Sequence, residues 1–319
     1  MLSLVIPLYR SEENLERLFA ELSLLAPKVP LKFEVVFVID GSPDRCDAVL
    51  AAAAPALSWS CRVVHLSRNF GAFAAITAGL RHGNGDYFAV LAADLQEPPE
   101  LVLDFLDRML RGEADIVFGV RSRRSDPFLS ALLSKVFWRV YRRIVNGEIP
   151  SGGVDIFGCT RQVRDQLLTL READSSLIAL LFWIGFRRAF VTYERRPRRE
   201  GKSAWTMAKK LRYALNSIFN FTDLPIRILF FAGGLGTSAA VLLGIVVLVT
   251  KLLGDIPIPG YTPIVLSILF FGGLTALGLG IVGEYLWITL QNTRNRPGFI
   301  VRTVDEYSSK SKATAHPEN

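Results

Sequence analysis

The segment from Asp86 to Glu100, DYFAVLAADLQEPPE, decides the fold. Its apolar run, Tyr87 to Ala93, predicts a strand that is buried on both faces, as in a parallel sheet covered by helices. The run stops at Asp94, and Pro98 and Pro99 prevent further strand pairing and favour the start of a helix. Polar oxygens therefore stand at the carboxyl end of a central strand, which is where open α/β sheets bind ligands.

The polar residues after this strand have two interpretations. Asp94 and Gln96 place oxygen atoms near one another, and Mg²⁺ or Mn²⁺ binds such oxygens together with substrate phosphates. The other interpretation is an ordinary turn before a proline-capped helix, with no bound ion. The remaining sequence has to decide between them.

Strands and helices alternate through the first half of the chain. The other predicted strands are Leu2 to Leu8, Phe33 to Ile39, Arg62 to Leu66 and Asp115 to Val120. Apolar residues at helical spacing lie between them, for example from Glu12 to Leu25, where Ser11 is the expected N-cap. Strands separated by helices predict βαβ units, and therefore an α/β fold with a mostly parallel sheet.

Residues suited to a nucleotide follow each predicted strand, at one edge of the sheet. They are Tyr9, Asp40, Arg68 with Asn69, Asp94 with Gln96, and Arg121. An aromatic ring, carboxylates and an arginine fit the base, the ribose hydroxyls and the pyrophosphate of a nucleoside diphosphate. The chain contains neither G-x-x-x-x-G-K-[ST] nor G-x-G-x-x-G after a strand, which argues against P-loop and Rossmann dinucleotide sites.

Five short motifs occur in a fixed order between Pro7 and Ser122: PLYRSEEN, VIDGSPD, LSRNFG, AADLQEPPE and GVRS. Together they resemble the nucleotide-sugar domain of inverting family 2 glycosyltransferases, which have the GT-A fold. More narrowly, they resemble the polyprenyl-phosphate branch, which includes dolichyl-phosphate mannose synthase and bacterial undecaprenyl-phosphate sugar transferases. Because NRPGFIV, Asn295 to Val301, also resembles that branch, the similarity covers essentially the whole chain.

The resemblance implies roles for the residues at the strand ends. The expected nucleotide-sugar-binding residues are Pro7, Tyr9, Glu12, Asp40, Arg68, Asn69 and Gln96. Asp94 and Gln96 are the expected ligands of Mg²⁺ or Mn²⁺, and Asp94 is also an expected catalytic residue. The family motif at this strand is usually Asp-x-Asp-Leu-Gln, whereas Ala92 stands at its first position. We therefore expect weaker metal binding and a need for a relatively high metal concentration.

A basic stretch follows the fifth predicted strand, and its cations alternate with apolar residues in the pattern of an amphipathic helix. The resemblance implies that basic residues there hold the phosphate of a lipid acceptor, for which the planar guanidinium is well shaped. A solvated charged face is the alternative. The expected acceptor-phosphate-binding residues are Arg121, Arg123, Ser134, Lys135, Arg139 and, from a later loop, Lys202.

Asp155 lies in the glycine-rich segment GGVDIFG, between apolar residues. The resemblance implies that it is a second catalytic residue, at the reaction centre. A structural ion pair with a preceding arginine is the alternative. A phosphate monoester loses its second proton near a pKa of about 6, so the acceptor needs no obligatory base at neutral pH. We expect Asp155 to orient the sugar or an arginine, or to stabilise charge at the anomeric carbon.

The second half of the chain predicts a membrane protein. Of the 319 residues 50% are hydrophobic and the formal net charge is +7. Ile226 to Val249 and Tyr261 to Trp287 are each long enough to cross a hydrocarbon core, which takes about 20 apolar residues. Basic residues flank their outer ends, so the positive-inside rule places both termini in the cytoplasm. Because the basic residues lead directly into these spans, a membrane surface is favoured over nucleic acid as their partner.

These patterns predict the following segments. Residues 1–195 are a cytoplasmic GT-A catalytic domain, 196–225 a basic interfacial amphipathic segment, 226–250 and 261–288 two transmembrane helices, 251–260 an external loop, and 289–319 a cytoplasmic tail. The N-terminus has no basic region and only a short apolar run, so we do not expect it to act as a signal peptide. Glycines in the spans favour close helix contact, which makes a homo-oligomer a reasonable expectation.

The resulting hypothesis is an inverting glycosyltransferase of the plasma membrane. It would move a single sugar from a nucleotide diphosphate sugar, with UDP-glucose as the first choice, to undecaprenyl phosphate at the cytoplasmic face. A non-catalytic scaffold that binds nucleotide sugars is an alternative, which Ala92 favours. A processive polysaccharide synthase is disfavoured because the chain lacks Gln-x-x-Arg-Trp. A small export or flipping protein would not need the five motifs.

Overall fold

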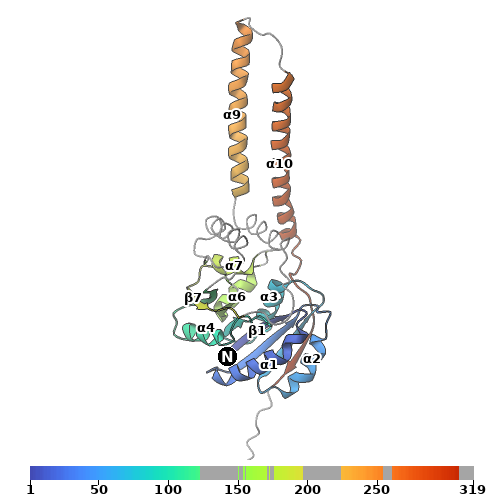
Figure 1. The fold of residues 1–319 in the computed structure, drawn as a ribbon, viewed down its shortest axis with the longest axis vertical. Helices are drawn as coiled ribbons and strands as arrows, with labels where there is room; N and C mark the ends of the chain where they lie inside the picture. The colour runs from blue at the N-terminus through green and yellow to red at the C-terminus, as the bar shows by residue number, and fades with distance from the viewer. Residues whose placement is uncertain are drawn as a thin grey trace, which may run out of the picture. The chain divides into compact units, whose positions relative to one another are not determined.

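The computed structural model describes residues 1–122, 150, 154, 156–170, 172, 176–196, 224–253 and 261–308. The chain divides into two compact units, Met1–Met207 with Pro297–Asn319, and Ala208–Arg296. Figure 1 shows the sheet and its helices in the first unit, and the two long helices α9 and α10 of the second.

The first unit is built on an eight-stranded sheet with the order β7-β5-β6-β4-β1-β2-β3-β8. The strands are β1 Leu2–Leu8, β2 Phe33–Ile39, β3 Ser60–Leu66, β4 Tyr87–Val90, β5 Ile116–Arg121, β6 Ile156–Thr160, β7 Arg188–Tyr193 and β8 Val301–Tyr307. β1 pairs in parallel with β2 and β4, β2 with β3, and β5 with β7. β6 and β8 are antiparallel to their neighbours. The predicted α/β fold with a mostly parallel sheet is therefore confirmed.

Helices cover both faces of this sheet. They are α1 Glu12–Leu25, α2 Cys46–Ala53, α3 Ala72–His82, α4 Leu101–Leu110, α6 Arg161–Thr169 and α7 Leu177–Trp183. Alternate residues of β1 point to opposite faces, and those from Leu2 to Leu8 join the core under α1 and α2. Val5, on the other face, packs so closely on α3 that a Cβ at Gly79 would overlap it. The parallel strands are thus buried on both sides, as the apolar runs predict.

Three strands lie where the sequence does not predict them. β6 falls in the glycine-rich segment, β7 near the end of the predicted catalytic domain, and β8 in the expected cytoplasmic tail. β4 is also shorter than its apolar run, because Leu95 N donates to Ala92 O and closes a turn. The amide of Leu91 still bonds to Val5 O, so the pairing with β1 ends just before that turn.

The second unit contains α9, Leu224–Leu252, and α10, Tyr261–Thr293. The two helices run antiparallel, with Gly278 near Leu229 and Gly236 near Phe271. Within the described residues one helical segment, Phe270–Thr293, is long and apolar enough to cross a membrane. The predicted second span stays a prediction.

Candidate active site

The carboxyl ends of β4, β1, β2 and β3 are neighbours at one edge of the sheet. The loop after each of these strands contains one residue with a left-handed backbone, namely Leu95 (φ 51°), Arg10 (φ 53°), Gly41 (φ 57°) and Gly71 (φ 97°). A left-handed conformation costs a non-glycine residue about 1–2 kcal/mol. Strain of this kind concentrates at ligand sites, so this edge, the donor rim, is the candidate site.

Asp40 joins the loops after β2 and β3. Its side chain is only 2% exposed, and its carboxylate accepts hydrogen bonds from Phe70 N (2.7 Å) and Gly71 N (2.9 Å). Burial raises the pKa of Asp40, although the two amide bonds and the charge of Arg68 act in the opposite direction. A Cβ at Gly41 would overlap the backbone of Arg68 and Asn69, so the two loops touch through a glycine. Asp40 therefore shapes the site, and its predicted contact with a nucleoside stays a prediction.

Asp44 and Glu12 join the loops after β1 and β2. Asp44 Oδ2 accepts from Glu12 N at 3.0 Å, and Glu12 in turn accepts from Arg45 N at 3.0 Å and Arg45 Nε at 2.9 Å. Ser11 precedes α1, but its hydroxyl donates to Tyr9 O, so Asp44 takes the helix-capping role expected of Ser11.

Asp44 also receives hydrogen bonds from its own loop. Burial alone would raise its pKa, but hydrogen bonds from Cys46, Ser42 and Glu12 N hold that pKa below its ordinary value. Ser42 Oγ lies 2.6 Å from Asp44 and accepts from Arg10 N at 2.7 Å. The carboxylate of Glu12 is thus engaged with Arg45 at the edge of the rim, and its predicted role in the nucleotide pocket stays a prediction.

The loop after β4 is tied to the segment that follows β7. Asp94 is half-buried and accepts from Gln96 N at 3.3 Å. Gln96 O accepts from Arg196 N at 2.8 Å, and Gln96 Nε2 donates to Arg196 O at 3.4 Å. The buried Glu97 pairs with Arg195 at 3.5 Å. Because β7 runs parallel to β5, Arg195 and Arg196 reach the same edge of the sheet as Asp94.

The remaining predicted donor residues also lie on this edge. Tyr9 is 40% exposed, and the guanidinium of Arg10 lies 5.6 Å from its ring centre. Arg68 lies over the ring of Phe70 at 4.4 Å, and Asn69 is exposed. Pro7 is the last but one residue of β1 and is half-buried. An exposed aromatic ring and a cation are therefore available for a base and a phosphate.

The acceptor residues are described only in part. Arg121 ends β5 beside Tyr193, and Ser122 N donates to Tyr193 O at 2.9 Å. The other residues predicted for the acceptor and the reaction centre lie outside the described residues. They are Arg123, Ser134, Lys135, Arg139, Asp155 and Lys202.

The donor rim fits a divalent cation only as a site shared with substrate. Asp94 and Gln96 supply a carboxylate and an amide oxygen, whereas Ala92 supplies no ligand. In the part of the chain that the structure describes, no group of three or more His, Cys, Asp or Glu side chains could hold a metal. Mg²⁺ commonly binds one or two carboxylates and completes its shell with water and substrate phosphates. The two residues fit that arrangement.

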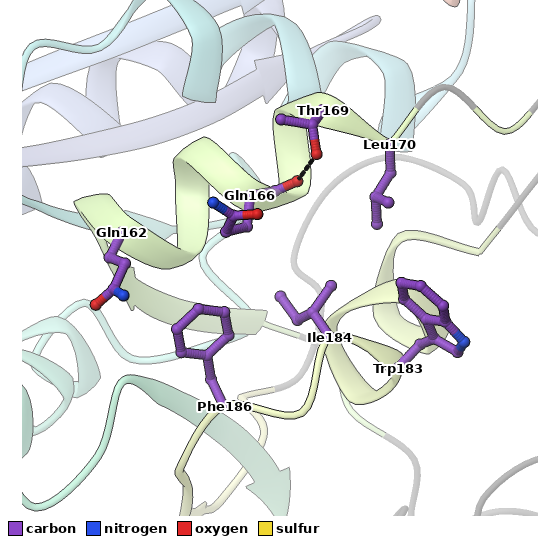
Figure 2. A pocket seen from close by; sticks show the side chains of 7 residues that line it. All are labelled: Gln162, Gln166, Thr169, Leu170, Trp183, Ile184 and Phe186. Atoms are coloured by element: carbon purple, nitrogen blue, oxygen red, sulfur yellow. Dashed lines mark hydrogen bonds between the residues drawn. The ribbon is translucent and has the colours of Figure 1, made fainter.

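A separate pocket of about 350 Å³ lies between α6 and the end of α7 (Figure 2). Gln162 and Gln166 form one wall, and Trp183 and Phe186 stand opposite, as Figure 2 shows. None of its lining residues is charged, and none belongs to the loops after β1 to β4. The pocket therefore does not suit a diphosphate, and the donor rim stays the better candidate.

A family model described as glycosyl transferase family 2 matches residues 3–169. The chain belongs to glycosyl transferase family 2. This family 2 glycosyltransferase is 32% identical over 301 residues to an uncharacterised glycosyltransferase of Synechocystis sp., with 94% of each chain covered. It is 31% identical over 304 residues to the SfII prophage-derived bactoprenol glucosyl transferase of Shigella flexneri, with 94% of this chain and 97% of the relative covered.

A solved structure supports the fold of this family 2 glycosyltransferase. The glucosyl-3-phosphoglycerate synthase of Mycobacterium tuberculosis has a TM-score of 0.51 and 19% identity, over 70% of this chain and 80% of the synthase. At that identity the likeness shows the fold alone. The predicted GT-A fold, family and glycosyltransferase class are thus confirmed.

Several residues of the site carry no signal in the sequence. Leu95 is a branched residue in a left-handed conformation, which no local pattern predicts. Asp44 caps a helix from another loop, so its role depends on how β1 and β2 pair. In the sequence, Arg195 and Arg196 are only two of several neighbouring basic residues. Their contacts with Glu97 and Gln96 depend on the position of β7, a strand that the sequence does not predict.

Proposed function

We propose that this glycosyltransferase moves one sugar from a nucleoside diphosphate sugar, UDP-glucose being the first choice, to undecaprenyl phosphate at the cytoplasmic face of the plasma membrane. The observation that carries the proposal is the donor rim, where four strand ends place Tyr9, Asp40, Arg68 and Asp94 on one edge. The acceptor is proposed because the relative of Shigella flexneri, similar over 94% of this chain, is named for bactoprenol glucosyl transfer.

The donor part of the proposal rests on loops that are already shaped. Asp40 holds the backbone at Phe70 and Gly71, and Asp44 and Ser42 hold the backbone after β1. Loops that are fixed before binding lose little conformational entropy when a ligand arrives. In this proposal the ring of Tyr9 stacks on the base, and Arg68 and Asn69 face the ribose and phosphates.

The proposed metal site is the pair Asp94 and Gln96 together with the diphosphate of the donor. A Mg²⁺ or Mn²⁺ ion bound there supplies positive charge that stabilises the departing diphosphate. Gln96 also holds Arg196 at the rim, and Arg195 follows with its charge beside Glu97. Two protein cations thus lie beside the proposed metal ligands, each of them paired with a glutamate, Arg195 with Glu97 and Arg196 with Glu100 at 3.6 Å.

The proposed transfer is a single displacement. An oxygen of the lipid phosphate attacks the anomeric carbon, the bond from that carbon to the diphosphate oxygen breaks, and the nucleoside diphosphate leaves. Because a phosphate monoester carries two negative charges above a pKa of about 6, its oxygen attacks without a general base. Arg121 with the predicted Arg123, Ser134, Lys135, Arg139 and Lys202 would hold this phosphate, and Asp155 would lie near the sugar.

The proposed membrane anchor consists of two spans. Phe270–Thr293 is long and apolar enough to cross, and α9 has no charged residue from Ile228 to Thr250. Under the positive-inside rule, the basic residues at 209–212 and 294–302 favour a cytoplasmic location for both outer ends of the proposed spans. Residues 196–225 would lie in the headgroup layer, where each basic residue contributes about 1 kcal/mol of attraction.

The test uses membranes containing the full chain, undecaprenyl phosphate, Mg²⁺ or Mn²⁺, and a panel of labelled UDP and GDP sugars. Label from one donor should enter the organic-extractable lipid, and chelation should abolish it. Gln166→Ala, in the pocket away from the rim, is the matched control and should keep full transfer. Donor binding without any lipid label would overturn the proposal in favour of the scaffold. If sugar transfer survives thorough chelation, the metal is not part of the mechanism.

A further inference from the structure

The C-terminal strand β8 is attached to β3 by two pairs of side chains. His65, in β3, is 4% exposed, and its Nε2 lies 2.9 Å from Asp305 Oδ2 while its Nδ1 lies 3.7 Å from Asp47 Oδ1. Arg62, nearer the start of β3, pairs with Glu306 at 2.8 Å. A buried imidazole thus stands between a carboxylate of β8 and a carboxylate of α2, beside the end of β3 that enters the donor rim.

Backbone contacts carry this attachment into the loop after β3. Ser67 N donates to Ile300 O at 2.9 Å, and Phe299 is 8% exposed beneath the guanidinium of Arg81. The loop from Ser67 onward contains the amides of Phe70 and Gly71 that bind Asp40. Ile300, directly before β8, therefore holds the first residue of the loop that Asp40 shapes.

The pairing of the two strands changes at the same point. His65 faces Thr303, but Leu66 faces Val301, so the register shifts between His65 and Leu66. Shifts of this kind are frequent beside active sites, where they change the direction of a strand or of a side chain. The shift therefore sets the direction in which the chain leaves β3 and enters the donor rim.

Covering the edge of a sheet does not require these polar groups. A loop or strand with apolar side chains would protect β3 equally well, and burying an imidazole costs free energy unless its nitrogens are matched. Replacing a buried charged or polar set by apolar residues is often neutral or stabilising. The polar set at His65 instead fixes one arrangement of β8 on β3, which points to positioning.

We propose that β8 is a positioning element of the donor site, and that His65, held by Asp305, is the positioning residue through which it fixes the loop from Ser67 to Gly71. The inference rests on the proposed function for its ligand, a nucleoside diphosphate. It means that the segment following the helix α10 helps to build the donor site on a strand far away in the sequence. Loss of the contact between Asp305 and His65 therefore weakens donor binding, although neither residue contacts the donor in this proposal.

The test compares Asp305→Ala with Glu306→Ala in the full-length protein in detergent. Both variants remove one partly exposed carboxylate of β8 from an ion pair, but only Asp305 contacts His65. Titration calorimetry with UDP and Mn²⁺ gives donor affinity, lipid labelling from UDP-glucose gives kcat and KM, and thermal unfolding gives stability. Asp305→Asn, which keeps an acceptor for His65, serves as the conservative rescue.

We expect Asp305→Ala to raise the Kd for UDP and the KM for the donor about fivefold, a typical size for coupling between separate sites, with kcat nearly unchanged. Asp305→Asn should restore most of the affinity, and Glu306→Ala should bind UDP like the wild type. Equal UDP affinity in Asp305→Ala and Glu306→Ala would overturn the inference, as would a fall in kcat that only follows the loss of thermal stability. If the wild type binds UDP but labels no lipid, the proposed function fails while the UDP titrations still decide the role of β8. A wild type that binds no nucleotide overturns both.

Discussion

The two halves of the sheet use left-handed residues at opposite edges. In β4-β1-β2-β3 such a residue follows each strand, at Leu95, Arg10, Gly41 and Gly71. In β7-β5-β6 the described left-handed residues, Gly112 and Gly185, come before β5 and β7. The first half therefore turns sharply at its carboxyl edge, whereas the second half turns sharply at its amino edge.

This difference separates the two substrates in our account. The turns of the first half are bonded to one another through Asp40, Asp44 and Ser42, which prepares a fixed site for the nucleotide. In the second half, β5 and β7 are followed by basic segments after residues 121 and 193, which contain the predicted acceptor residues. In the proposed function, the sheet would thus build the donor site, and the segments after β5 and β7 would supply the acceptor site.

The largest expected effect concerns Asp94, the proposed metal ligand in the first half of the sheet. Asp94→Asn should lower sugar transfer about 100-fold, because loss of one group that stabilises a developing charge commonly costs that much. Lipid labelling at saturating donor measures it. Asp107→Asn, which removes an exposed carboxylate paired with Arg111 on α4, is the matched control and should be neutral. A similar loss of sugar transfer in Asp107→Asn would show that the effect of Asp94→Asn does not arise at the donor rim.

Gly41→Ala tests whether the first half depends on contact between its turns. Gly41 and Gly112 both have positive φ, but only at Gly41 would a Cβ meet the backbone of a neighbouring loop. Gly112→Ala should cost about 1–2 kcal/mol of stability from strain alone, and Gly41→Ala a further 1–3 kcal/mol from overpacking. Thermal unfolding and UDP titration measure both variants. Unchanged UDP affinity in Gly41→Ala would contradict the account.

Ala92→Asp should lower the metal concentration that sugar transfer requires. Restoring the first carboxylate of the motif adds a ligand beside Asp94, and we expect the metal concentration for half-maximal transfer to fall about tenfold, the lower end of the effect of supporting groups at metal sites. A titration of transfer rate against Mg²⁺ in both proteins checks it. An unchanged midpoint would mean that Ala92 does not face the bound ion.

Leu95 offers a direct measure of the strain at the rim. Leu95 is 2% exposed with φ 51°, so both Leu95→Ala and Leu95→Gly lose its buried side chain. Glycine tolerates positive φ whereas alanine does not, so Leu95→Gly should be about 1 kcal/mol more stable than Leu95→Ala. Thermal unfolding compares them, and the opposite order would show that the turn relaxes when the side chain is removed.

We expect Asp44 to make the stability of the fold depend slightly on pH. The pKa of Asp44 lies below its ordinary value of 3.8 in the folded protein, so the stability it contributes is complete above pH 3.8 and is lost as the pH falls through the lowered value. Asp44→Asn should therefore reduce Tm at pH 7, and the gap to the wild type should narrow toward pH 3. A gap that stays constant with pH would mean that Asp44 acts through shape alone.

The sequence predicts strands β1 to β5 well and strands β6, β7 and β8 poorly. Strands β1 to β5 consist mostly of buried apolar residues, which predicts each strand, and the polar residues of the site follow directly where these strands end. β6 is short and contains Gly158, where a Cβ would crowd Phe105 of α4. The glycine is needed for this packing, but in the sequence it indicates a loop. β8 is an edge strand, and its sequence VRTVDEY contains three charged residues, Arg302, Asp305 and Glu306, so the sequence alone indicates a polar tail.

The sequence predicts which residues lie at the site but not the contacts that hold them there. Asp40, Arg68, Asp94 and Gln96 follow strands, so the topology brings them to one edge. The contacts that hold them are different in kind, because Asp40 with Gly71 and Gln96 with Arg196 join residues that are distant in the sequence. Such contacts depend on the order of strands, which local patterns do not encode.

The most direct test of the donor rim is electron paramagnetic resonance of Mn²⁺ with the full-length protein, with and without UDP, corrected for Mn²⁺ held by UDP alone. We predict that the wild type removes free Mn²⁺ from solution strongly only when UDP is present, because Asp94 and Gln96 leave most of the metal shell to the diphosphate. Asp94→Asn should abolish that uptake. If Asp94→Asn takes up Mn²⁺ with UDP as the wild type does, the metal and the diphosphate bind elsewhere, and the account of the rim is wrong.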